Sequence, residues 1–114
     1  MDERRRSSRR TGKLRAECEL SSSGKNFSAL ALDVGFEGLR LSVLTNLAVG
    51  SAVQVSLPLP GQSEPIRFEA TVVWSRPFTE TKEGVRAHAY EVGARFLEIS
   101  EEDKARIRAL LVSG

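Results

Sequence analysis

The sequence predicts a mainly β fold: a small six-stranded antiparallel β-barrel followed by one C-terminal α-helix. Three observations lead to this prediction. Apolar and polar residues alternate with period two in most runs between residues 14 and 97, as in half-buried strands. Turn-forming clusters separate these runs, and helical periodicity appears only after them. A chain of 114 residues accommodates one domain with one hydrophobic core.

Six runs are expected to form the strands. Two of them, 14–20 and 27–33, precede four runs in which every second residue is apolar. The alternating apolar positions are Leu39, Leu41 and Val43; Val53, Val55 and Leu57; Ile66, Phe68, Ala70, Val72 and Trp74; and Tyr90, Val92, Ala94 and Phe96. Turns are expected where Ser, Gly, Pro and Thr gather between the runs, at 21–24, 35–38, 58–65 and 79–84.

The segment from about 100 to 112 is expected to form the helix. Ser100 can cap its N-terminus, and the three acidic residues that follow lie where the helix dipole favours negative charge. Apolar residues then recur at helical spacing and form a stripe that can dock on the sheet: Ile107, Leu110 and Leu111.

The N-terminus is a basic arm. The first fifteen residues hold seven basic side chains against two acidic ones, a net charge of +5, whereas the whole chain carries +2. No apolar residue lies between Met1 and Leu14, so residues 1–13 cannot build a core and are expected to stay flexible until an anionic partner orders them. Residues 14–114 are expected to form the barrel domain with its helix.

Several classes of protein are disfavoured. His88 is the only histidine, and we find no nucleophile elbow, P-loop lysine or metal-ligand histidine pair, so neither an enzyme nor a metal site is expected. The single cysteine, Cys18, excludes an internal disulfide and is expected to be an inert strand residue. The apolar stretches fall far short of the ~20 residues that span a bilayer. A cytoplasmic protein without membrane insertion or cofactor is expected.

Arginines in the arm supply the first half of a candidate binding site. Arg5 and Arg9 lie four residues apart, and Arg6 and Arg10 repeat this spacing, with Arg4 beside them. Guanidinium groups offer planar donor pairs that suit phosphate oxygens and can stack on a purine face.

The segment 31–41 supplies the second half, as a strand, a glycine-containing turn and another strand. Asp33 places a carboxylate acceptor near the end of the first strand. Gly35 and Gly38 would let a ligand approach the backbone and leave amide N–H groups pointing outward.

Together the two halves resemble the PilZ domain, a bacterial receptor domain for cyclic di-GMP. That family is marked by R-x-x-x-R before the first strand and by a later [D/N]-x-S-x-x-G. The matching residues are Arg5 and Arg9, then Asp33 and Gly38. The stretches DERRRSSR, LDVGFEGLRL, ATVVWSR and VGARFLEISEEDKARIRALL also look like family segments, so the resemblance extends over residues 3–112.

The resemblance implies a non-enzymatic second-messenger receptor. In such domains the arginine arm wraps over cyclic di-GMP, commonly a stacked pair, while the hairpin motif holds a guanine edge; Asp33 would accept hydrogen bonds from that edge. The signal would pass in trans to a protein effector, with motility, adhesion or polysaccharide output, from a monomer or a ligand-dependent dimer. Trp74 and Arg76 are secondary candidates for the site: Trp74 either packs in the core or at its rim, or flanks the nucleotide. Arg40 and Arg95 are expected to be solvated.

One residue departs from the family pattern, because position 35 is glycine where the family usually has serine. Losing one hydrogen bond to a charged group costs about 1.5–3 kcal/mol, or about ten- to hundredfold in affinity. The alternative function is therefore a degenerate PilZ-fold adaptor that binds proteins and no nucleotide. Nucleic-acid or membrane-surface binding through the arm is disfavoured, since +5 on residues 1–15 of a +2 chain leaves −3 on residues 16–114.

Overall fold

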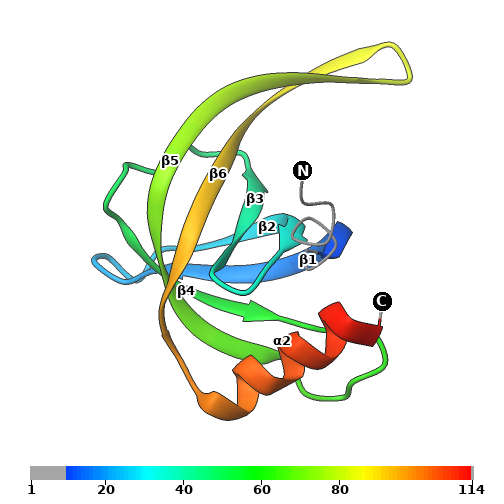
Figure 1. Cartoon of the computed structure of the whole chain (residues 1–114). Helices are drawn as coiled ribbons and strands as arrows, with labels where there is room; N and C mark the ends of the chain where they lie inside the picture. Colours follow the sequence, from blue (N-terminus) through cyan, green and yellow to red (C-terminus); the bar gives the residue numbers. More distant parts are fainter. Residues whose placement is uncertain (1–9, 114) are drawn as a thin grey trace, which may run out of the picture.

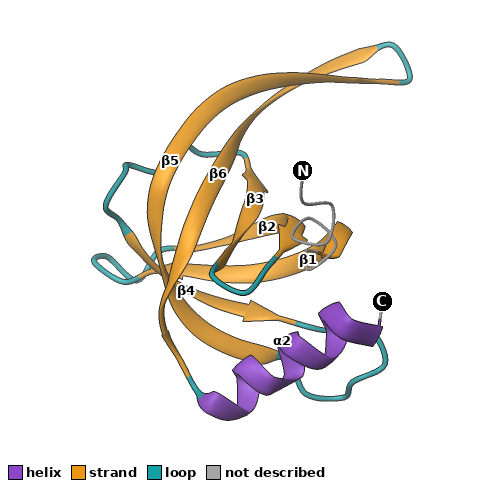
Figure 2. Cartoon of the chain, viewed as in Figure 1, coloured by secondary structure: helices purple, strands orange, loops and turns teal. Residues whose placement is uncertain are grey.

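The computed structural model describes residues 10–113 and confirms the mainly β fold. Within this range the elements are β1 (Arg10–Leu20), β2 (Asn26–Val34), β3 (Gly38–Val43), β4 (Ala52–Leu57), β5 (Ile66–Lys82), β6 (Val85–Ile99) and α2 (Glu101–Ser113). The strands close into an antiparallel barrel in the order β1-β2-β3-β6-β5-β4, with β4 pairing back to β1 (Figures 1 and 2).

The alternating apolar residues fill the barrel, as the sequence predicts. On β4, Val53, Val55 and Leu57 are each at most 3% exposed. Their partners on β5 are Ala70, Phe68 and Ile66, and these are at most 4% exposed. Because successive side chains of a strand point to opposite faces, this pairing leaves the intervening polar residues outside the barrel.

The hairpin of β5 and β6 is longer than the sequence predicts. The expected turn at 79–84 is wrong over most of its length, because strand pairing continues to Lys82 and Val85. Glu83 and Gly84 alone reverse the chain, with φ of 53° and 80°, as a two-residue hairpin turn requires. The hairpin therefore extends beyond the barrel, away from α2 (Figure 1).

The N-terminus of α2 is capped as predicted. The Ser100 hydroxyl accepts a hydrogen bond from the Asp103 N–H at 3.0 Å. The Asp103 carboxylate in turn accepts the backbone N–H of Arg67 on β5 at 3.1 Å, which fastens the helix to the barrel. Ile107, from the predicted stripe, is 2% exposed in the core. The side chains of the other two stripe residues lie outside the described part.

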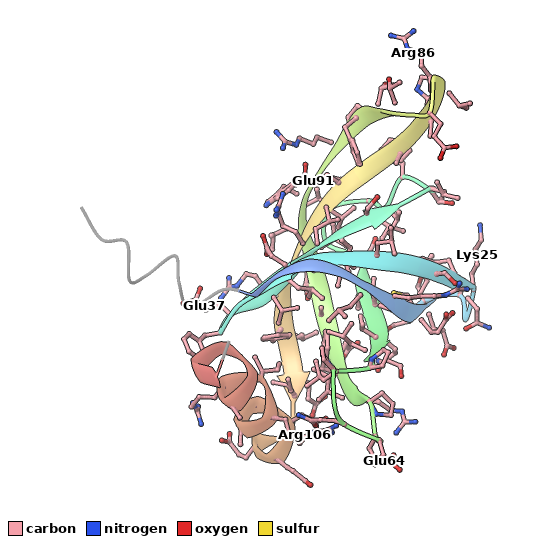
Figure 3. The ribbon with its side chains drawn as sticks, turned by 90° about the vertical axis from the view of Figure 1, so that its right-hand side faces the viewer. Lys25, Glu37, Glu64, Arg86, Glu91 and Arg106 are labelled. Carbon is pink, nitrogen blue, oxygen red and sulfur yellow. The ribbon has the colours of Figure 1, made fainter. Side chains whose placement is uncertain are left out.

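Arg106 on α2 holds the long β4–β5 loop. It donates to the Gln62 side chain at 2.7 Å and to the Pro65 carbonyl at 3.3 Å, and it also contacts the Glu64 carbonyl (Figure 3). The helix therefore secures the end of the barrel that lies opposite the β5–β6 hairpin.

Cys18 and His88 behave as ordinary strand residues. Cys18 is buried in β1, and burial raises the pKa of its thiol to about 12, so it stays protonated and unreactive. His88 is exposed on the hairpin. Among the described residues no three His, Cys, Asp or Glu side chains gather as they would around a metal ion. Within the same range no helix has the length and apolar character needed to span a membrane.

Candidate functional site

A β-bulge turns Asp33 out of the barrel. Ala29 and Ala31 face the core, so strict alternation along β2 would put Asp33 there too. The register with β3 instead shifts between Ala31 and Asp33, and Val34 takes the inward position. Asp33 consequently pairs with Arg40 on the outer face. Its carboxylate is only 8% exposed, because neighbouring side chains cover it.

A second bulge does the same for Trp74. The register between β5 and β6 shifts between Val72 and Trp74, so the indole leaves the inward row and is 38% exposed. Packing inside the core is therefore wrong for Trp74, and the indole lies at the rim of the barrel instead. The indole lies across Gly93, where an added Cβ would come within 2.2 Å of the ring.

The two bulges align residues of four strands in one row across the outer face, and the backbone of a fifth strand continues the row. Thr11 on β1 pairs with Asp33 on β2, and Asp33 pairs with Arg40 on β3. Arg40 pairs with Gly93 on β6, which pairs with Trp74 on β5. Because the central member, Gly93, has no side chain, the indole can lie against its backbone, and a hollow lined by Arg40, Gly93 and Trp74 remains beside the ring.

This hollow is a cleft of about 400 Å³. It is lined by Asp33, Glu37, Gly38, Leu39, Arg40, Val73, Trp74, Gly93, Ala94 and Arg95. Gly38 forms part of its floor because β3 approaches β6 closely: a Cβ on Gly38 would lie 2.0 Å from the Ala94 carbonyl oxygen. Two glycines of the cleft lining, Gly38 on β3 and Gly93 on β6, thus leave no room for a side chain of their own.

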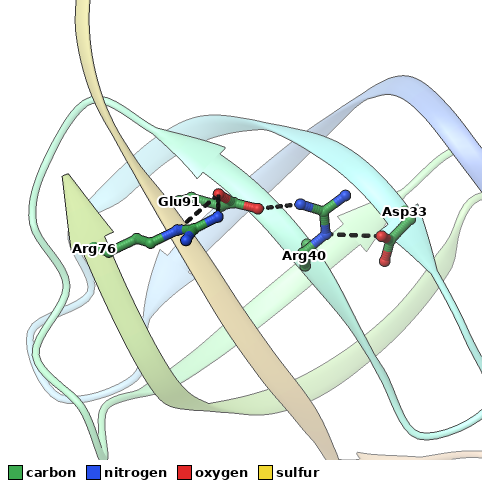
Figure 4. A network of polar contacts seen from close by, with 4 residues as sticks. All are labelled: Asp33, Arg40, Arg76 and Glu91. Atoms are coloured by element: carbon green, nitrogen blue, oxygen red, sulfur yellow. Dashed lines mark hydrogen bonds and ion pairs between the residues drawn. The ribbon is translucent and has the colours of Figure 1, made fainter. Parts of the chain in front are cut away.

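Four charged side chains form a chain of ion pairs beside the cleft (Figure 4). Arg40 Nε donates to Asp33 Oδ2 at 2.7 Å, and the other end of the same guanidinium contacts Glu91. Arg76 donates two hydrogen bonds to Glu91 Oε1, at 2.7 and 3.1 Å. The Arg76 guanidinium also lies 5.7 Å from the centre of the Trp74 ring, within the range of a cation–π contact.

The ion pairs favour the charged forms of Glu91 and Arg40. Hydrogen bonds from Arg76, and then from Arg40, lower the pKa of the Glu91 carboxyl although burial opposes them. The hydrogen bond to Asp33, with a smaller contribution from Glu91, raises the pKa of Arg40. The expectation of a solvated Arg40 is therefore wrong, since it bridges two carboxylates.

The β2–β3 loop differs from the prediction that its glycines leave amide N–H groups pointing outward. The Gly35 N–H does not point outward, because it donates to the Gly38 carbonyl at 2.8 Å. The Glu37 carbonyl accepts the Phe96 N–H at 2.9 Å, which ties the loop to β6. Among the described residues, positive-φ glycines occur at Gly24, Gly50, Gly61 and Gly84; Gly35 adopts a backbone conformation open to other residues.

The structure brings part of the predicted site together. Asp33, Gly38 and Trp74 all line the cleft, with Gly35 in the adjoining loop. Arg4, Arg5, Arg6 and Arg9 lie outside the described residues. Arg10 begins β1, where its backbone pairs with Val34, so residues 10–13 extend the first strand toward the cleft.

Sequence reasoning missed Glu91 and the role of Arg40. Both occupy ordinary polar positions of alternating strands, and 51 residues separate them. No local pattern signals their contact. The pairing of β3 with β6 alone brings the two side chains together.

The sequence as a whole matches the PilZ domain over residues 3–113. The chain belongs to the PilZ domain family. The match includes the arm that carries Arg5 and Arg9 as well as the barrel and α2. A search of curated proteins found no match.

Solved PilZ structures share this fold. The Escherichia coli YcgR PilZ domain with cyclic di-GMP has a TM-score of 0.73 and 15% identity, over 92% of this chain and 86% of that one. Bacillus subtilis MotI, an inhibitor of motility, has a TM-score of 0.71 and 15% identity, over 93% of this chain and 48% of the MotI chain. The K. pneumonia MrkH complex with cyclic di-GMP has a TM-score of 0.66 and 16% identity, over 92% of this chain and 48% of the MrkH chain. This PilZ domain thus spans about half the length of MotI and MrkH.

Proposed function

We propose that this PilZ domain is a non-enzymatic receptor that binds cyclic di-GMP between its arginine arm and the cleft at Asp33. The observation that carries the proposal is the pairing of Thr11 with Asp33. The arm must leave β1 beside the candidate guanine acceptor. Arg5 lies six residues before Thr11, so an extended chain lets it reach at most about 20 Å from that point, enough to cover the cleft.

The chemistry of the cleft suits a guanine dinucleotide. An ionised aspartate can accept hydrogen bonds from the N1–H and N2–H₂ edge of guanine, whereas adenine offers no N1–H donor. Arg5 and Arg9 would supply charge-assisted donors for the phosphates. Trp74 at the far side of the cleft would supply a ring face for the second base, and Arg76, which lies over that ring, would supply a cation nearby.

Family membership supports the same ligand, since the YcgR and MrkH structures hold cyclic di-GMP. The receptor would act in the cytoplasm and in trans on a protein effector, as a monomer or as a ligand-dependent dimer. Ordering of the arm over the cleft would create the surface that the effector recognises. The output would be motility, adhesion or polysaccharide production.

Isothermal titration calorimetry with cyclic di-GMP tests the proposal. We expect a dissociation constant below about 10 μM, and at least about tenfold weaker binding for Arg5→Ala or Arg9→Ala. Arg86→Ala is the matched control, because Arg86 is exposed near the hairpin tip, far from the cleft (Figure 3). Binding that is undetectable at about 100 μM ligand would favour the adaptor function, which the glycine at position 35 already suggests.

A further inference from the structure

Arg95 is a cation at the rim of the cleft that the proposed contacts with ligand leave unused. It lies on β6 two residues beyond Gly93, and therefore on the same outer face of the strand, and it lines the cleft. Its side chain is exposed, as the sequence predicts. Within the described part of the chain it forms no hydrogen bond or ion pair, so its N–H donors face solvent or a ligand.

The other two arginines beside the cleft differ from Arg95 in this respect. Arg40 is held between Asp33 and Glu91, and Arg76 donates two hydrogen bonds to Glu91 (Figure 4). A guanidinium that is already paired with a carboxylate attracts a second anion less strongly, because the two charges of the pair largely cancel. Of the two arginines that line the cleft within the described residues, Arg95 is thus the one that no carboxylate pairs with.

Bare backbone separates Arg95 from the start of the arm. Arg95 pairs with Gly38 on β3, and the Gly38 carbonyl accepts the N–H of Gly35, just past the end of β2. The preceding residue, Val34, pairs with Arg10 at the start of β1. Neighbouring strands lie about 4.8 Å apart, so this stretch from β1 to β6 is about 14 Å wide. Because both residues between its ends are glycines, an anion lying on it would meet no side chain of theirs and could contact a guanidinium from each end.

We propose that Arg95 binds a phosphate of cyclic di-GMP from the barrel side, opposite the arginines of the arm, with the phosphate over Gly35 and Gly38. This inference rests on the proposed function, because it names a further residue for the same ligand. A guanidinium suits this role, since it donates two parallel hydrogen bonds to phosphate oxygens. The folded barrel thereby has a phosphate contact of its own, beside those proposed for Arg5 and Arg9.

Calorimetry with cyclic di-GMP on two variants of Arg95 tests the inference. Arg95→Gln removes the charge, and we expect about tenfold or more loss of affinity. Arg95→Lys keeps the charge and should bind within about threefold of the wild type, because an ammonium group also binds phosphate. Arg86→Gln is the matched control, since Arg86 is exposed on the same strand near the hairpin tip (Figure 3), and it should bind like the wild type.

The dependence of affinity on salt separates a phosphate contact from a merely structural role. Salt screens charges at exposed sites, so between about 50 and about 300 mM NaCl the wild type should lose more affinity than Arg95→Gln does. The Tm of each variant should equal that of the wild type, because an exposed side chain without partners contributes little to stability. A loss of affinity that comes with a much lower Tm and an unchanged salt dependence would overturn the inference.

The remaining outcomes distinguish this inference from the proposed function. A wild-type protein that binds cyclic di-GMP no better than Arg95→Gln would overturn the inference alone. An equally large loss in Arg95→Lys would also overturn it, because a need for the planar guanidinium would indicate stacking on a base instead of a charge contact with phosphate. A wild-type protein that does not bind cyclic di-GMP would refute the proposed function and the inference with it.

Discussion

Replacing Gly38 by alanine should destabilise the domain even without ligand. A Cβ at this position would lie 2.0 Å from the Ala94 carbonyl oxygen, 1.4 Å short of the 3.4 Å at which ordinary contact begins. The atom it meets is backbone, so no side-chain rotation relieves the overlap. Strands β3 and β6 must therefore separate locally, at the rung that joins Gly38 to Arg95.

The cost follows from what this separation breaks. Overpacking costs about 1–3 kcal/mol, and one weakened buried backbone hydrogen bond adds about 1–3 kcal/mol, so we expect a loss of about 3 kcal/mol. The unfolding entropy is about 2.1 cal/mol/K per residue, so for a chain of this length a loss of about 3 kcal/mol lowers Tm by about 12 °C.

Thermal and urea unfolding followed by circular dichroism measure the effect, with Gly61→Ala as the control. Gly61 has a φ of 76° but no atom within 4 Å of its added Cβ, so it should lose only about 1–2 kcal/mol from backbone strain. A Gly38→Ala protein whose Tm falls no further than that of Gly61→Ala would show that the glycine is not required for strand packing.

Two further predictions follow from the site. Because Arg76 and then Arg40 lower the folded-state pKa of Glu91 below 4.5, its contribution to stability is present above that pH and lost as pH falls through the lowered value. Unfolding by urea between about pH 6 and pH 3 should show a shallower acid loss in Glu91→Gln, and parallel curves would contradict this. Gly35→Ser should keep the wild-type Tm, since positive φ is not needed there, and calorimetry should show binding tightened by about ten- to hundredfold; unfolding or weaker binding would contradict this prediction.

The strands and the helix could be predicted from the sequence because their signals are local. Val53, Val55 and Leu57 alternate with polar residues and all three are buried. Ser100 caps α2 through a bond that spans only three residues. The local sequence does not show where the strands of the β5–β6 hairpin end. Thr79 and Thr81 lie among turn-forming residues, although threonine also favours strands. Only the pairing of Lys82 with Val85 shows that both strands continue to the tip.

The alternating faces of the strands and the capped helix follow from the sequence alone, because the spacing of apolar residues and the capping bond both depend on neighbours in the chain. The motif residues Asp33 and Gly38 are recognised in the same way, from their spacing along the chain. Tertiary structure decided that Asp33 and Trp74 face outward, since their bulges arise from the register that partner strands impose. It also decided that Arg40 joins Asp33 to Glu91. Residues so far apart in sequence meet only when the barrel closes, and no local pattern encodes that closure.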